Sequence, residues 1–189
     1  MPWIDGVPSE HQAGEPGLPA IFQALSLSPE ALEQVKRLNE TLAFGNSALS
    51  RVQEEAIATV VAAANRCRYG ALTHGGFLRL HSGDEQLTSA LLADYSQSGL
   101  GEEDQTMLAF AAKLTLEPAA MERGDVEGLR DAGFDDDEIL SIVLITGLVN
   151  FMNRLAQGLG VDVPQAYLGG VMQWLASPAR DQAWLLTPP

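Results

Sequence analysis

The chain has 189 residues, 46% of them hydrophobic, which is enough for one domain with a sizeable core and argues against disorder. Its formal net charge of −14 argues against binding to nucleic acid or to anionic membranes. The sequence shows no basic and apolar start of the signal-peptide kind and no uninterrupted apolar run of about 20 residues. With a single cysteine no internal disulfide can form, and we expect a soluble, cytoplasmic protein.

Three regions are expected along the chain. Residues 1–17 contain three prolines and three glycines and predict an extended N-terminal arm. Its apolar Trp3 and Ile4 either dock on the core or on another subunit, or belong to a loosely ordered end. Residues 18–176 form the single helical domain. Residues 177–189 form a C-terminal tail, whose apolar side chains pack either on the body or on a neighbouring subunit.

Helix signals follow one another throughout the domain. Ser28-Pro29 is a helix start, and the pairs Ser50/Gln53 and Asp135/Glu138 resemble capping boxes. The expected helices are 29–44, 52–65, 67–80, 85–95, 102–116, 125–132, 138–160 and 164–175. No segment shows the alternation of a strand, so the predicted fold class is all-α.

A faint internal repeat accompanies these helices. The segment that begins at Glu55 and the segment that begins at Glu138 start alike, and in this register Gly70 lies opposite Asn153. Either a duplication of one helical unit or a coincidence between two alanine- and leucine-rich helices explains the similarity.

Cys67 is a candidate redox thiol. If its helix starts at residues 65–66, the free N–H groups of the first turn and the charges of Arg66 and Arg68 favour the thiolate. The alternative is a small buried side chain in an alanine-rich helix pair. Because Cys67 is seven residues before His74, about 10 Å along a straight helix, we expect no direct bond between them.

Glu55 and His74 are candidate proton-transfer residues. A carboxylate on the buried face of the AIATVVAAA helix would suit a proton shuttle, while the alternative is that Glu54 and Glu55 only complement the helix dipole. His74, followed by two glycines, is either a general base or a hydrogen-bonded core histidine. The scattered histidines give no metal-ligand spacing, and we expect no metal or cofactor.

These residues carry a family resemblance. The stretch Glu55…Cys67-Arg-Tyr-Gly70…His74 resembles the active-site signature of the alkyl hydroperoxidase D / carboxymuconolactone decarboxylase superfamily: Glu, eleven residues, Cys, two residues, Cys, three residues, His. The surrounding sequence, roughly residues 25–162, resembles the peroxidase-related branch. The resemblance implies an AhpD-like helical bundle that assembles into a homo-oligomer and reduces organic hydroperoxides with a dithiol. It also implies that Glu55 and His74 relay protons and that an external thiol or reductant protein restores the sulfur.

Gly70 departs from that signature, because it stands where the second cysteine would be. One sulfur cannot close the internal disulfide, but Cys67 could pass through a sulfenic acid that an external thiol reduces. The alternatives are an acid–base lyase of the decarboxylase type, using Glu55 and His74, and a non-catalytic binding or assembly module. We expect the pocket between the two helices to be walled by Phe77, Phe151 and Met152. A Gly70→Cys substitution is expected to restore dithiol chemistry.

Overall fold

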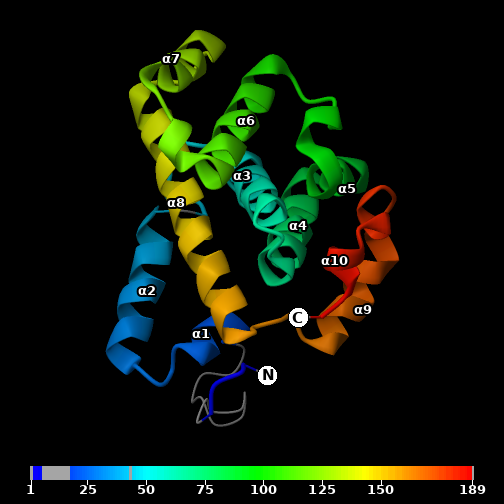
Figure 1. Cartoon of the computed structure of the whole chain (residues 1–189). Coiled ribbons are helices and arrows are strands. Elements are labelled where there is room, and N and C mark those ends of the chain that lie inside the picture. Colours follow the sequence, from blue (N-terminus) through cyan, green and yellow to red (C-terminus); the bar gives the residue numbers. More distant parts are fainter. Residues whose placement is uncertain (1, 6–17, 43, 189) are drawn as a thin grey trace.

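The computed structural model describes residues 2–5, 18–42 and 44–188, and helices dominate this part of the chain with no strand in it (Figure 1). The all-α prediction is therefore confirmed. The α-helices are α1 (Ala20–Ala24), α2 (Pro29–Leu42), α3 (Arg51–Ala64), α4 (Arg68–Ser82), α5 (Glu85–Asp94), α6 (Glu102–Leu116), α7 (Arg123–Ala132), α8 (Asp136–Leu159), α9 (Gln165–Trp174) and α10 (Ala183–Leu186). The short 3-10 helices are η1 (Tyr95–Gln97), η2 (Pro118–Ala120) and η3 (Ala179–Asp181).

Local capping signals set most of the helix boundaries. Ser50 and Gln53 form the predicted capping box at the start of α3, and Asp135 and Glu138 form the one that starts α8. Helix α8 stops at Gly160, whose left-handed backbone ends the helix without a side-chain clash. Other boundaries differ from expectation: α1 and α10 were not predicted, and α7 begins earlier because another capping box precedes it.

Helix α3 is the centre of the molecule, with α4, α6 and α8 packed around it (Figure 1). All the residues of α3 from Glu54 to Ala62 are buried, so this part of the helix is covered on every side. Such burial all round a helix is the pattern of a core helix, and the small alanine side chains let the neighbouring helices approach closely. The alanine-rich sequence of α3 thus places Glu54 and Glu55 in the interior.

The turn between α3 and α4 aligns these two helices side by side. Asn65 ends α3, Arg66 adopts a left-handed backbone with φ of 49°, and Cys67 caps α4. The Asn65 side chain donates to Asn150 Oδ1 at 2.9 Å, which ties the turn to α8. The predicted break at residues 65–66 is confirmed. The internal repeat suggested by the sequence does not extend to this turn, because the matching part of α8 is an unbroken helix.

Both ends of the described chain pack on the helical body. Trp3 N donates to the carbonyl of Leu159 at 2.7 Å, and the indole lies on Gly160, where a side chain would collide with it. The rest of the predicted arm, residues 6–17, lies outside the described residues. In the C-terminal tail, Leu185 is completely buried and its carbonyl accepts from Arg68 Nε at 2.8 Å. Of the two expectations for the tail, the structure shows packing on the body.

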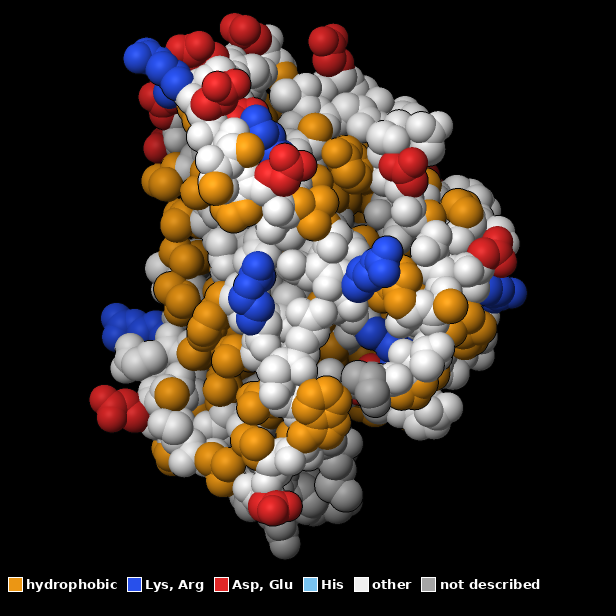
Figure 2. Space-filling model, viewed as in Figure 1, with side chains coloured by type: hydrophobic (Ala, Val, Ile, Leu, Met, Phe, Trp, Pro, Cys, Tyr) orange, Lys and Arg blue, Asp and Glu red, His pale blue; other side chains and the backbone are white. Residues whose placement is uncertain are grey.

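Helix α8 presents an apolar face outward. Leu140, Val143 and Phe151 are 55%, 37% and 42% exposed, and Figure 2 shows a band of apolar side chains over the position of this helix. In the described part of the chain, α8 meets the length and composition of a membrane span, but half of that window is buried in the protein. Polar residues such as Ser141 and Asn153 interrupt its apolar sequence. Its inner half is core, and its outer half is an uncovered apolar surface.

Candidate active site

A cavity of about 280 Å³ lies between α3, α4 and α8, and residues from the α1 and α2 region close it. Its wall is mostly apolar, and it includes Phe77 and Met152 as predicted. Phe151 is not part of the lining and belongs to the outer face of α8, so that prediction was wrong. One helical step of about 100° separates Phe151 from Met152, which turns their side chains in different directions. The polar residues of the lining are Asn39, Arg51, Glu55, Thr73, His74 and Asn153.

Glu55 and His74 meet in this cavity. Glu55 is completely buried, and its Oε2 lies 2.8 Å from His74 Nδ1. A carboxylate can only accept, so the bond assigns the proton to Nδ1 and leaves Nε2 as the basic nitrogen of the neutral ring. No described residue is hydrogen-bonded to Nε2. The pair therefore has a buried acid that orients an imidazole, with one nitrogen left for another molecule.

Arg51 completes the group and was not identified from the sequence. Its Nη2 lies 2.5 Å from Glu55 Oε1 as an ion pair, although the N–H is not aligned for a hydrogen bond, and its Nη1 donates to Glu54 at 3.0 Å. Glu54 also accepts from Ser47 Oγ at 2.6 Å. Glu54 is in the first turn of α3 as expected, but it is a buried ion-pair partner as well. The three- and four-residue spacings from Arg51 were the signal that could have revealed this arrangement.

Phe44 fixes the other side of the imidazole. Its ring stacks on His74 with 5.3 Å between centroids and 17° between planes, and the Arg51 guanidinium lies 4.7 Å above the same ring. Phe44 has a φ of 62°, which is uncommon for a bulky side chain and is held here by these contacts. The sequence predicted position 44 as the end of a helix, but α2 ends at Leu42. The left-handed backbone at Phe44 follows that end and directs the ring toward His74.

Cys67 lies apart from this group. It is 1% exposed, packs with apolar residues such as Ile21 and Ala156, and is not in the cavity lining. Burial raises the pKa of its thiol from an ordinary 9.0 to about 11, although the N–H groups of Tyr69 and Gly70 pull in the other direction. The predicted helix-start effect is thus present but smaller than the cost of desolvating a thiolate.

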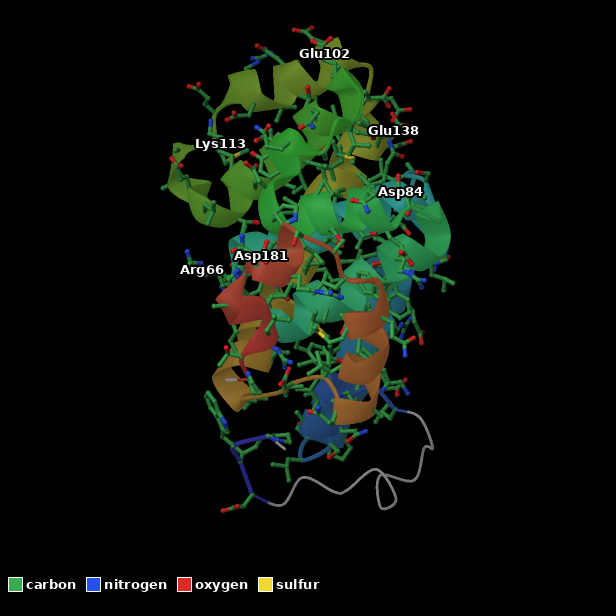
Figure 3. All side chains as sticks on the ribbon, turned by 90° about the vertical axis from the view of Figure 1, so that its right-hand side faces the viewer. Arg66, Asp84, Glu102, Lys113, Glu138 and Asp181 are labelled. Atoms are coloured by element: carbon green, nitrogen blue, oxygen red, sulfur yellow. The ribbon has the colours of Figure 1, made fainter. Side chains whose placement is uncertain are left out.

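The neighbouring arginines do not activate the sulfur either. Arg66 is exposed and lies at the edge of the molecule with its side chain directed outward, as Figure 3 shows, and Arg68 forms an ion pair with Asp162. The thiol itself donates a weak hydrogen bond to the Asn153 carbonyl at 3.8 Å. Sequence reasoning placed the sulfur, the acid and the imidazole around one hollow. The structure joins only Glu55 and His74 there, because the N-cap of α4 directs Cys67 toward α1 and the end of α8.

Gly70 does lie at the cavity, but its missing side chain has not left an empty space. A Cβ built at Gly70 would lie 2.4 Å from Asn153 Oδ1 and 3.1 Å from Ala62 Cβ. Asn153 is 2% exposed and also lines the cavity. The expected gain from Gly70→Cys stays a prediction, and it now has a condition, because a sulfur at this position requires the Asn153 side chain to move. The internal repeat, which set Gly70 opposite Asn153, was the one sequence signal that pointed to the pair.

The remaining histidines and acidic side chains outside this site form no further candidate site among the described residues. Within their ranges no group of three or more His, Cys, Asp or Glu side chains could hold a metal ion. His81 Nε2 accepts from Arg51 Nε at 3.4 Å, and His11 lies outside the described residues.

Known structures share this fold. An uncharacterized peroxidase-related protein from Silicibacter sp. TM1040 is 34% identical, with a TM-score of 0.77 over 88% of this chain and 91% of that one. The alkylhydroperoxidase AhpD core of a peroxidase-related protein from Ralstonia eutropha JMP134 is 25% identical, with a TM-score of 0.74 over 79% and 78% of the two chains. A variant of the debrominase Bmp8 in complex with 2,3,4-tribromopyrrole is 17% identical, with a TM-score of 0.72 over 88% and 87%, and shares the fold alone.

No family model matches the chain, and no curated protein matches it. The fold and the Glu55–His74 site define an AhpD-like helical protein. On the similarity to the Silicibacter structure, the chain belongs to the peroxidase-related proteins of the alkyl hydroperoxidase D / carboxymuconolactone decarboxylase superfamily. The debrominase shows that proteins of this fold differ in the reactions they catalyse.

Proposed function

We propose that this protein is an acid–base enzyme that moves a proton on a small neutral organic substrate, with His74 as the base. The observation that carries the proposal is the hydrogen bond from His74 Nδ1 to the buried Glu55 at the wall of a cavity. Nε2 takes a proton from the substrate and returns it to another atom of the same molecule. Glu55 stabilises the imidazolium formed in between, and Arg51 holds Glu55 in position.

The lining supports a neutral and largely apolar substrate. Arg51, a cation in this lining, already pairs with Glu54 and Glu55, so it offers no separate charge to a carboxylate. The net charge of −14 disfavours an anion further. A cavity of about 280 Å³ accommodates a single small ring and its substituents. Lactones and cyclic ketones have both the required size and carbon-bound protons of suitable acidity.

Proton exchange tests this function directly. The protein is incubated in D2O with cyclohexanone and with α-angelica lactone, and deuterium uptake at carbon is followed by NMR. Since general base catalysis contributes about 10²–10⁴-fold, His74→Gln should lower the catalysed rate by that amount and Glu55→Gln by a smaller factor. Cys67→Ser is the matched control and should keep the rate. Undiminished exchange in His74→Gln, or no catalysed exchange in the wild type, contradicts the proposal.

A thiol peroxidase is the second candidate, supported by three preserved signature positions and by the peroxidase-related structures. In this reaction the Cys67 thiolate attacks one oxygen of an organic hydroperoxide, the O–O bond breaks, and an alcohol leaves after protonation. The sulfenic acid then reacts with an external thiol to give water and a mixed disulfide, which a second thiol reduces. The burial of Cys67 weighs against this reaction. Peroxide consumption with excess dithiothreitol that is lost in Cys67→Ser would favour it.

We also propose a homo-oligomer located in the cytoplasm. The apolar outer face of α8, which includes Leu140 and Phe151, supports association between acidic subunits through apolar contacts. The cytoplasmic location is supported by the lone cysteine of the sequence.

The remaining alternative is a non-catalytic binding module that keeps the cavity. Such a protein would bind ligands without any reaction that depends on His74.

A further inference from the structure

Asn153 and Gly70 share one position in the cavity wall. The Asn153 side chain, from α8, reaches α4 where Gly70 has no side chain, and its Oδ1 lies 2.4 Å from the place of a Cβ. No pair of real atoms of this kind tolerates that separation. A side chain at position 70 therefore excludes the Asn153 amide from its present orientation, and in this protein the amide occupies the space.

The amide is polar, buried and incompletely bonded. Asn153 is 2% exposed, and its Nδ2 has no hydrogen-bond partner among the described residues. Buried amide groups are almost always paired, because an unpaired donor loses its hydrogen bonds to water and gains none. The exception here is a side chain of the cavity lining. Its Nδ2 has almost no accessible surface, so a bound molecule supplies the missing partner when the amide turns toward the cavity.

We propose that Asn153 is a ligand-binding residue that hydrogen-bonds the hydroxyl or carbonyl oxygen of the small organic substrate. This inference rests on the proposed function and names the group that holds the substrate beside His74. An amide offers both a donor and an acceptor, so it matches either kind of oxygen. The surrounding wall, with Leu148 and Met152, matches an apolar body that carries one such oxygen.

Gly70 is then part of the binding site through its lack of a side chain. Substitution by alanine would force the Asn153 amide away from its present place without removing it. Gly70→Ala and Asn153→Leu are thus independent ways to remove the same hydrogen bond, one by displacement and one by replacement with an apolar side chain of similar size.

Phenol and toluene are suitable probes, because they have similar shape and differ by a hydroxyl in place of a methyl group. Binding of each to the full-length protein is measured by isothermal titration calorimetry. The wild type should prefer phenol, and Asn153→Leu and Gly70→Ala should each reduce the ratio of the two affinities by about 3- to 10-fold, as expected for one neutral hydrogen bond. The matched control is Gln157→Leu, one turn further along α8 and outside the lining, which should leave the ratio unchanged.

The inference is overturned if the wild type does not prefer phenol, or if the ratio stays at the wild-type value in the folded variants. Two variants are used so that poor folding of one does not end the test. Failure of the proposed function has a different signature: proton exchange is undiminished in His74→Gln, while the phenol-to-toluene affinity ratio still falls in Asn153→Leu and Gly70→Ala.

Discussion

The reactivity of Cys67 decides between sulfur chemistry and acid–base chemistry, and its magnitude follows from the structure. Burial raises the thiol pKa from 9.0 to about 11. At pH 7 the thiolate fraction then falls from roughly 1% to roughly 0.01%, a hundred-fold loss of the nucleophilic form. With 1% of the residue exposed, a reagent also has to wait for the protein to open. We therefore expect Cys67 to react with iodoacetamide at least 100 times more slowly in the native protein than in the unfolded one.

The assay is alkylation at pH 7, followed by mass spectrometry, in buffer and in a concentration of urea that unfolds the chain. The single cysteine makes the readout unambiguous, and the unfolded protein is its own control. The reaction should also accelerate as the pH approaches 11. If the alkylation rate of the native protein is within about ten-fold of the rate of the unfolded protein, burial does not protect the thiol. The argument against Cys67 as the peroxide-reducing residue is then refuted.

Four further predictions concern stability, redox chemistry and assembly. Because the pKa of the Cys67 thiol is higher in the folded than in the unfolded protein, the stabilising contribution of the neutral thiol is complete below pH 9 and is lost by about pH 11. In urea titrations the free energy of unfolding of the wild type should therefore fall by about 3 kcal/mol more than that of Cys67→Ala between these pH values, and equal losses would refute the raised pKa. Arg51→Met should lower the free energy of unfolding by about 3 kcal/mol, since two buried carboxylates lose the arginine of their ion pairs, whereas Arg123→Met, at an exposed pair, should change it by less than about 0.5 kcal/mol. Gly70→Cys should give dithiol-dependent peroxide reduction only in combination with Asn153→Ala, and activity in the single variant equal to that of the double variant would show that Asn153 yields freely. Phe151→Glu should shift the proposed oligomer toward monomer in light scattering, with Leu116→Glu as the control at an exposed leucine on α6, and an unchanged mass would remove this face of α8 from the proposed interface.

The signals that located the helices are local, which is why the sequence predicted so much of the fold. The Ser50/Gln53 capping box is read from four consecutive residues, and its hydrogen bonds form within the same stretch of chain. The helix α6 was expected at residues 102–116 and lies there. Segments without such signals were missed, namely α1 and α10, which are only five and four residues long.

The site was only half predictable for a related reason. Glu55 and His74 stood out by residue type and spacing, and they do meet in the structure. Asn153 had no such signal beyond the internal repeat, because its contact with Gly70 joins residues 83 positions apart through the packing of α8 on α4. Sequence reasoning therefore treated position 70 as a loss and could not see what had replaced it.

The sequence by itself determined the helical fold class, the family signature and the two residues of the proposed acid–base pair, Glu55 and His74, because capping, periodicity and spacing act along the chain. Only the tertiary structure decided that Cys67 is buried away from the cavity and that Arg51 and Asn153 belong to the site. The physical reason is that burial and side-chain contact depend on how distant helices are rotated against one another, and one residue of rotation turns a side chain by about 100°.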